Sequence, residues 1–208
     1  MNWNNWVLNR QAKDNPPNEW IRILEYLKKI LPDRLINKIE FTAFVIKGKR
    51  TARWILNRDH PEYCTKNEAL QVAKKLTWQM LLSKGSPPIN PELKELLLCD
   101  NEDCKLFIGH EGRCNTEEVP FGITRCHLCK KIIYFEDFDR DAKRDPLSIQ
   151  IGHSIPLSRT TRGHNVRNVV WAHRKCNQIQ SEQTLYEVLE NMSTILEAHG
   201  YTIEKRYF

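Results

Sequence analysis

The most constraining feature of this sequence is a pair of short metal-ligand motifs that lie far apart along the chain. Cys126 and Cys129 form a CxxC motif, and the run HRKC later places His173 and Cys176 at the same inner spacing. Two intervening residues let both side chains of a motif reach one tetrahedral ion, so the four residues predict a closed structural zinc site. The alternative is a reduced thiol pair beside an unrelated histidine.

A second zinc ion could bind in the segment just before the CxxC motif. Its predicted ligands are Cys99, Cys104, His110 and Cys114. Their spacing is less regular, and His127 could replace His110 as a ligand. Neither predicted site leaves a coordination position open, so both ions are expected to be structural. Cys64 stands apart from the other cysteines and is expected to be a small buried residue.

Composition indicates a folded chain of one or two domains. The sequence has 208 residues, 40% of them apolar, with six tryptophans,. No apolar run reaches the roughly 18–20 residues of a membrane span. The first residues carry no apolar export signal, so we expect a cytoplasmic protein whose thiols stay reduced.

Helical periodicity dominates the first part of the chain. Apolar residues predict helices over Glu19–Leu31 and around Leu35–Ile39, and a Thr65/Glu68 capping box predicts a helix reaching Ser83,. The segment KGSPPINP that follows marks a boundary. We therefore expect a helical domain over residues 1–84, of possible use in DNA recognition, and a second domain over 92–208.

The second domain is expected to begin and end with helices. Leu93–Leu98 predicts a short helix. Thr184–His199 predicts a longer one with Gly200 as its C-cap,. Six apolar residues share one face of that last helix: Leu185, Val188, Leu189, Met192, Ile195 and Leu196.

Two basic segments suggest a polyanionic partner. Residues 150–180 contain three of the seven histidines, five lysines or arginines, and no acidic residue. Residues 47–58 are also basic without an acidic residue, and residues 1–98 carry a net charge of +7, from 17 basic and 10 acidic residues. Either segment could be an ordinary solvated surface. As DNA contacts they would act through Arg159, Arg162, Arg167, Arg174, Lys49, Arg50 and Arg53.

Strand patterns occur at IIYF (Ile132–Phe135), LSIQI (Leu147–Ile151) and NVVW (Asn168–Trp171), and a helix is expected over His173–Ile179,. With HSIPLS (His153–Ser158), NVVWAHRKCN and the flanking CxxC and HxxC motifs, this order resembles the HNH nuclease family, which has the ββα-metal fold. The resemblance covers residues 126–183. The resemblance implies a zinc-stabilised ββα-metal domain. With the second zinc knuckle expected at 99–114 and the expected N-terminal helical domain, the predicted fold class is α+β.

The resemblance also implies roles for three residues. His153 would be the general base that deprotonates water, Asn168 would hold the loop of His153, and Asn177 would ligate a catalytic Mg²⁺. One position departs from the family: an acidic metal ligand often precedes the histidine, and here that residue is Gly152. Gln150, Asp145 or His164 could substitute for it.

The function that the resemblance implies is hydrolysis of phosphodiester bonds in double-stranded DNA. We expect a sequence-specific type II restriction enzyme acting as a homodimer, because both strands must be cut. A phage or homing HNH nicking enzyme is one alternative. A non-catalytic, zinc-stabilised DNA-binding protein is another, and an RNA-binding zinc protein fits less well because the basic stretches lack interleaved aromatic residues.

Overall fold

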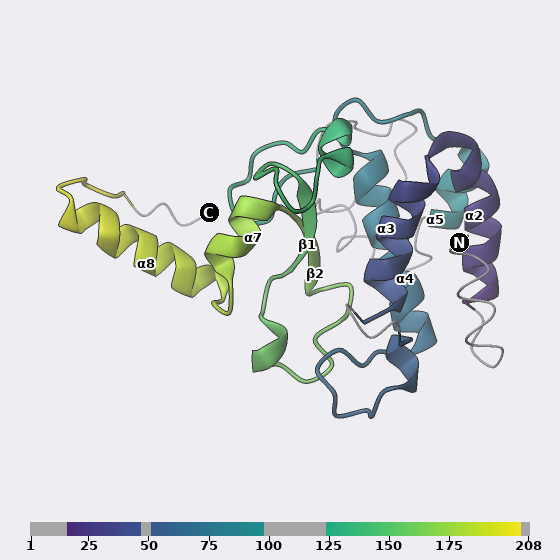
Figure 1. Ribbon diagram of the computed structural model, residues 1–208, viewed down its shortest axis with the longest axis horizontal. Helices are drawn as coiled ribbons and strands as arrows, with labels where there is room; N and C mark the ends of the chain where they lie inside the picture. The colour runs from purple at the N-terminus through teal and green to yellow at the C-terminus, as the bar shows by residue number, and fades with distance from the viewer. Residues whose placement is uncertain (1–15, 47–50, 98–123, 205–208) are drawn as a thin grey trace.

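The computed structural model describes residues 16–46, 51–97 and 124–204. The predicted second zinc knuckle (Cys99, Cys104, His110 and Cys114) and the basic residues Lys49 and Arg50 lie outside these ranges. Four helices pack together at one side of the molecule, a two-stranded sheet lies beside them, and the last helix extends away at the other side (Figure 1). Within the described ranges, no helix is both long enough and apolar enough to cross a membrane.

The helical part consists of α2 (Asn18–Ile30), α3 (Asp33–Phe44), α4 (Lys66–Leu81) and α5 (Pro91–Leu97). The expected helix starting near residue 19 is confirmed, and Pro32 separates it from α3. The capping box is also confirmed, because Thr65 Oγ1 accepts from the Glu68 N–H while Glu68 Oε2 accepts from the Thr65 N–H at 2.7 Å. These four helices enclose a core around Trp20, Ile39 and Leu76.

The sheet is a single antiparallel pair followed by a short helix. Strands β1 (Ile149–His153) and β2 (Val169–His173) pair with Ile149 opposite His173 and His153 opposite Val169. Helix α7 (Arg174–Gln180) follows β2 directly and packs on both strands. The two expected strands near 147–151 and 168–171 are therefore confirmed, with boundaries shifted by one or two residues.

The expected strand at Ile132–Phe135 is wrong. This segment makes only isolated bridges, Lys84 with Tyr134 and Arg125 with Ile132. Its extended run ends because Asp137 accepts a hydrogen bond from the Tyr134 N–H at 3.1 Å and starts the 3-10 helix Phe135–Asp139.

One hydrophobic core runs from the helices to the sheet. Helix α4 packs on β2, and Trp171 of β2 donates its indole N–H to the Leu76 carbonyl of α4 at 3.0 Å. The buried ammonium of Lys75 donates to the carbonyls of Val166 and Val169, the latter at 2.7 Å. Because buried carbonyls are costly to leave unpaired, these contacts fix how the sheet sits on the helices.

Helix α8 (Leu185–Ala198) is the element that extends away from the rest of the molecule (Figure 1). Its predicted limits are confirmed: Thr184 and Glu187 form a capping box, and Gly200 has the positive φ of 82° typical of a C-cap,. Most of its apolar face is exposed to solvent, since only Val188 of the six apolar residues is buried.

Substitution of Lys75 by methionine tests the link between helices and sheet. The variant keeps the length and apolar stem of the side chain but leaves the Val166 and Val169 carbonyls without their donor. We expect the free energy of unfolding, measured by urea titration, to fall by about 2 kcal/mol. Lys143→Met changes an exposed lysine and is the matched control. Equal unfolding midpoints for the two variants would contradict the assignment.

Candidate active site and metal centre

Four predicted zinc ligands meet in one cluster. The ligand atoms of Cys126, Cys129, His173 and Cys176 all lie within 4.8 Å of one another. Cys129 Sγ lies 3.4 Å from His173 Nδ1, which is close to the separation of two ligands on a tetrahedral ion with bonds of about 2.0–2.3 Å,. The residues present therefore fit a structural zinc ion.

Local backbone structure brings these ligands together. The CxxC turn closes through a hydrogen bond of 2.9 Å from the Cys126 N–H to the Lys131 carbonyl, and Lys130 takes a positive φ of 57°. His173 ends β2, and Cys176 lies in the first turn of α7. The ion would thus join the turn before the sheet to the point where the sheet becomes a helix.

Burial sets the protonation of the cluster. It lowers the pKa of His173, which keeps the imidazole neutral and able to ligate,. Burial and the neighbouring thiols raise the pKa of Cys176 to about 12. Metal binding must therefore displace a thiol proton, which makes the affinity for zinc decrease as the pH falls.

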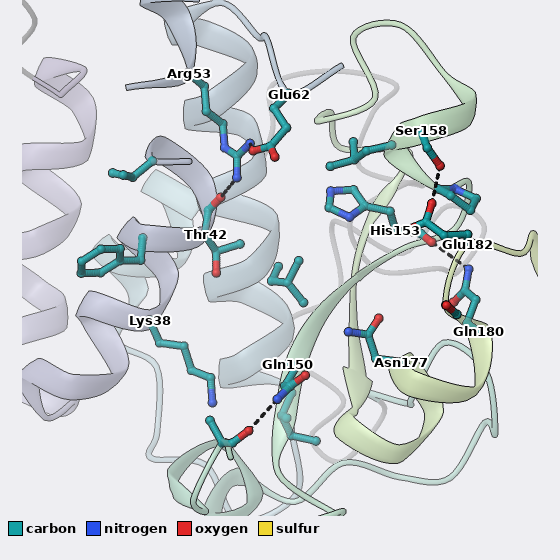
Figure 2. Close-up of a pocket in the computed structure, with 18 residues that line it drawn as sticks. Lys38, Thr42, Arg53, Glu62, Gln150, His153, Ser158, Asn177, Gln180 and Glu182 are labelled. Atoms are coloured by element: carbon teal, nitrogen blue, oxygen red, sulfur yellow. Dashed lines mark hydrogen bonds and ion pairs between the residues drawn. The ribbon is translucent and has the colours of Figure 1, made fainter. Parts of the chain in front are cut away.

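A cavity of about 520 Å³ lies between the helices and the sheet. His153 from β1 and Asn177 from α7 line one side, while Lys38 and Thr42 of α3 line the other (Figure 2). Arg53, predicted to contact DNA, also lines this cavity. Two cationic residues from the helical part thus share a pocket with two of the predicted catalytic residues.

His153 is paired with a second histidine. Its Nε2 lies 3.5 Å from Nδ1 of His164, which is fully buried. Among the described residues, Nδ1 of His153 has no hydrogen-bond partner. His164 is fully buried and is not among the residues that line the cavity, whereas His153 is.

Burial and a nearby positive charge keep this histidine pair neutral. Burial, and to a smaller extent the charge of Arg53, together lower the pKa of His153 to about 4. The pKa of His164 is lowered by the same two causes, burial first. At neutral pH, His153 therefore has an unprotonated nitrogen available to accept a proton.

The loop between the two strands is held by Asn168. Its side-chain Nδ2 donates to the carbonyls of Ile155 at 2.8 Å and Gly163 at 2.9 Å, and its Oδ1 accepts from the Ile155 N–H at 2.6 Å. Gln180 of α7 donates to the His153 carbonyl at 2.8 Å. These bonds limit movement of the backbone on which the imidazole of His153 is carried.

Asn177 lies directly over Gly152. A Cβ atom at residue 152 would stand 3.1 Å from Oδ1 of Asn177, which is tighter than an ordinary contact. A longer side chain at this position would therefore point at the Asn177 amide, and glycine leaves that amide its space.

The residues considered as substitutes for an acidic ligand have other partners. Asp145 pairs with Arg140 at 3.1 Å and accepts from the Leu147 N–H, while Gln150 donates to the Ala142 carbonyl at 2.7 Å. In the described part of the chain, the Cys126–Cys176 cluster is the one group of three or more histidines, cysteines or acids close enough to share an ion.

Arg53 is held in place inside the protein. It is 6% exposed, its Nη1 contacts Glu62 Oε2 at 2.7 Å, and its Nη2 donates to the Thr42 carbonyl at 3.2 Å. Its Nε has no hydrogen-bond partner. Lys38 is half-buried, which lowers its pKa to about 8, so it still carries a positive charge at neutral pH.

The other predicted DNA contacts have different surroundings. Arg159 pairs with Glu187 at 2.6 Å, and Arg162 pairs with Glu68 at 2.9 Å. Arg167 is exposed, with no ionic partner in the described ranges, and Arg174 is partly exposed at the start of α7. Of the three contacts predicted in the basic segment 47–58, namely Lys49, Arg50 and Arg53, only Arg53 lies within the described ranges.

Sequence reasoning did not identify Lys38, Thr42 or Glu62 as residues of the pocket. Lys38 and Thr42 lie on a helix about a hundred residues before β1, and no local pattern distinguishes them from other polar helix residues. His164 was considered as a metal ligand, and its contact with His153 was not expected.

Comparison with known proteins supports the fold. No family model matches this sequence, and no curated protein does. A solved structure described as the crystal structure of a type II restriction endonuclease superposes with a TM-score of 0.64 and 22% sequence identity. The match covers 91% of this chain and 86% of that chain. The chain therefore shares the fold of that restriction endonuclease.

Removing a predicted zinc ligand tests the metal centre. We expect the purified protein to contain zinc by elemental analysis, and Cys126→Ser to lose one equivalent. Its melting temperature should fall by about 10 °C or more, because a few kcal/mol of stability corresponds to such a shift in a chain of this size. Cys64→Ala is the matched control, since Cys64 is buried outside the cluster. Unchanged zinc content in Cys126→Ser would disprove the site.

Proposed function

We propose that this chain is a divalent-metal-dependent DNA endonuclease of the HNH type, and that it acts as a sequence-specific type II restriction enzyme. The observation that carries the proposal is the shared pocket, in which His153 and Asn177 face Arg53 and Lys38. The common fold with a restriction endonuclease supports a nuclease in general. The cytoplasmic location expected from the sequence is consistent with such an enzyme.

His153 would act as the general base of the reaction. With Nε2 turned to His164, Nδ1 is the nitrogen that can remove a proton from an attacking water,. The water oxygen would then bond to phosphorus as the bond from phosphorus to the leaving oxygen breaks. Burial of the pair and the bonds of Asn168 and Gln180 keep the imidazole in one orientation for this step.

Arg53 and Lys38 would bind the phosphate that is cut. Both side chains line the same pocket as His153, and the Lys38 ammonium also donates to the Phe138 carbonyl at 2.8 Å. The Arg53 guanidinium is fixed in place by Glu62 and the Thr42 carbonyl. A prearranged donor of this kind costs little reorganisation when negative charge develops on the phosphate.

Asn177 is the residue that would hold a catalytic divalent ion. Its amide oxygen is a hard ligand suited to Mg²⁺, which commonly keeps several waters and takes further oxygens from substrate phosphates. A bound ion would supply positive charge at the scissile phosphate and the leaving oxygen. Gly152 leaves the Asn177 amide free of a neighbouring side chain, in a site with few protein ligands.

Double-stranded DNA is the proposed substrate, and a homodimer would supply one pocket for each strand. Residues 1–84 would form the part that reads the sequence, with the basic segment around Lys49 and Arg50 and the exposed Arg167 and Arg174 as backbone contacts. Arg159 and Arg162 are already paired with carboxylates, which makes them weaker candidates. A nicking HNH enzyme would use the same pocket without the dimer.

The absent carboxylate at residue 152 favours one other candidate, a DNA-binding protein that has lost cleavage. Incubation of the purified chain with plasmid DNA and Mg²⁺ separates the two. Discrete fragments indicate a restriction enzyme, nicked circles a nicking enzyme, and intact DNA with shifted mobility a binding protein.

His153→Ala tests the general base. We expect the rate of plasmid cleavage with Mg²⁺ to fall by roughly 10²–10⁴-fold, the usual contribution of a positioned base. Zinc content should match that of the parent, since His153 lies outside the metal cluster. Cleavage at the parental rate would exclude His153 from the reaction.

The pH dependence of cleavage tests the environment of His153. If the general base were a histidine with the ordinary pKa of about 6.5, cleavage activity would decrease as the pH falls through that value. Because burial and Arg53 lower the pKa of His153 to about 4, this base stays unprotonated at lower pH. We expect kcat/KM on short duplexes to show no fall centred near pH 6.5, with zinc content verified at each pH. An acid limb centred there would contradict the lowered pKa.

A further inference from the structure

The apolar face of α8 has no partner within the described ranges. At 3.6 residues per turn, Leu185, Leu189, Met192 and Leu196 fall on one stripe, with Val188 and Ile195 at its edge,. Leu189 and Ile195 are 51% and 58% exposed, and Met192 and Leu196 are exposed as well. We call these six residues the α8 stripe. Ile179 of α7 adds a further exposed apolar side chain beside it.

The exposed area is large for a solvated surface. Five side chains that are each about half exposed correspond to roughly 400 Å² of apolar surface, which is already within the range of the largest patch on a typical monomer. Two such stripes packed together would bury about 800 Å², and the exposed Tyr186 and Tyr201 could extend the contact toward the 1,200–2,000 Å² of a stable interface,.

The charge of α8 argues against DNA and against a lipid surface as the partner of the α8 stripe. The helix contains Glu187, Glu190 and Glu197 and no lysine or arginine. These carboxylates would be repelled by phosphates, which excludes a DNA contact for this helix. A helix that lies on a lipid surface normally carries basic residues on its polar face, and this one is acidic. The stripe is therefore suited to another protein surface.

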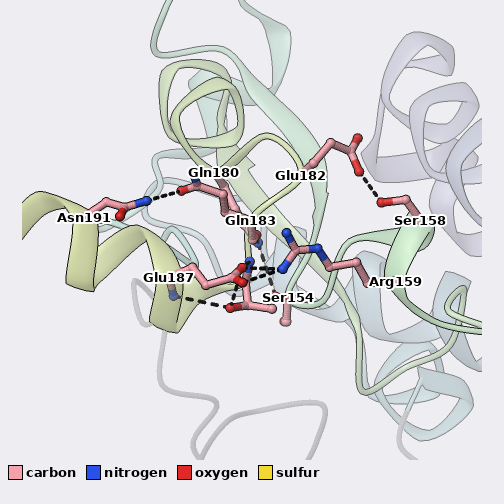
Figure 3. Close-up of polar contacts among 9 residues, drawn as sticks. Ser154, Ser158, Arg159, Gln180, Glu182, Gln183, Glu187 and Asn191 are labelled. Atoms are coloured by element: carbon pink, nitrogen blue, oxygen red, sulfur yellow. Dashed lines mark hydrogen bonds and ion pairs between the residues drawn. The ribbon is translucent and has the colours of Figure 1, made fainter.

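The base of α8 contacts the loop that follows His153. Arg159 in this loop donates to both oxygens of Glu187 at 2.6 Å, and Ser158 donates to Glu182 just before the helix (Figure 3). The Thr184 N–H also donates to Glu187, at 2.8 Å. The helix thus extends from the body in a defined direction, which favours an ordered contact surface over a loose tail.

We propose that two copies of this chain associate through the α8 stripe, with one stripe packed against the other. The stripe is apolar throughout, and the glutamates of α8 lie on the far side of the helix. Two stripes can therefore pack together without like charges facing each other. The choice of a second copy as occupant rests in part on the proposed function, because a chain with one pocket must pair to cut both DNA strands.

The association also bears on the pocket. Arg159 and Ser158 belong to the loop that Asn168 holds behind His153, and Gln180 at the end of α7 bonds to the His153 carbonyl. A partner that immobilises α8 therefore immobilises the segments on both sides of the general base.

Charge substitutions in the stripe test the proposal on the full chain without DNA or Mg²⁺. The parent should sediment with twice the mass of one chain, and the double variant Leu189→Glu/Leu196→Glu with the mass of one. Ala198→Glu adds one such charge on the exposed opposite side and should stay dimeric. Circular dichroism and zinc content should be the same for all three, which excludes unfolding as the cause.

A mixing experiment tests whether the stripes contact each other. Leu189→Lys/Leu196→Lys should be monomeric alone and form a dimer with the glutamate variant, whether the helices run parallel or antiparallel. A monomeric parent, dimeric glutamate variants, or a mixture that stays monomeric would each overturn the proposal. If the parent is a monomer that still cleaves DNA, this inference fails and the proposed function stands. If the parent is a dimer that depends on the stripe but does not cleave DNA, this inference stands and the proposed function fails.

Discussion

The buried ammonium group of Lys75 is the interaction on which the arrangement of this molecule depends. It lies between α4 and the first residues of β2 and saturates two carbonyls that face away from water. Together with the indole hydrogen bond of Trp171, it fixes one side of the sheet against the helices. The other side is then available to α7 and the pocket. A polar link in a hydrophobic interface specifies one docking geometry, whereas apolar contacts alone tolerate many.

The pocket shows how burial and charge can prepare a histidine for proton transfer. Burial of His153 disfavours its charged form, and Arg53 adds a positive charge nearby that acts in the same direction,. The cost is that an imidazolium formed during a reaction would also be disfavoured. An incoming phosphate would reverse that balance, since its negative charge would offset Arg53. Arg53 already pairs with Glu62 at 2.7 Å, so an entering anion would add to a charge pair that the pocket contains.

Local sequence patterns predicted those parts of the molecule that depend on short-range chemistry. The capping box at Thr65 follows from residues three apart, and the CxxC and HxxC spacings predicted a cluster that the structure brings together. The strand proposed at Ile132–Phe135 had the right composition, but Asp137 turns the backbone before a ladder can form. The roles of His153, Asn168 and Asn177 remain predictions from family resemblance, placed now in a common geometry.

Long-range contacts account for what the sequence did not reveal. Lys38 and Thr42 reach the pocket because α3 and α4 pack together and α4 carries the sheet, which no spacing within α3 encodes. Arg159 looked like a free cation in a segment without acids, but its partner Glu187 comes from the next helix.

The wall formed by Arg53 and Lys38 has a consequence for how such a protein can change over evolutionary time. A recombination event that exchanged the N-terminal helices would replace the cations facing His153 along with any surface that reads DNA. An exchanged helical part would therefore have to bring compatible side chains to the wall of the cavity. The two parts of the chain are expected to be inherited together, and their divergence to be coupled at the residues that line the cavity.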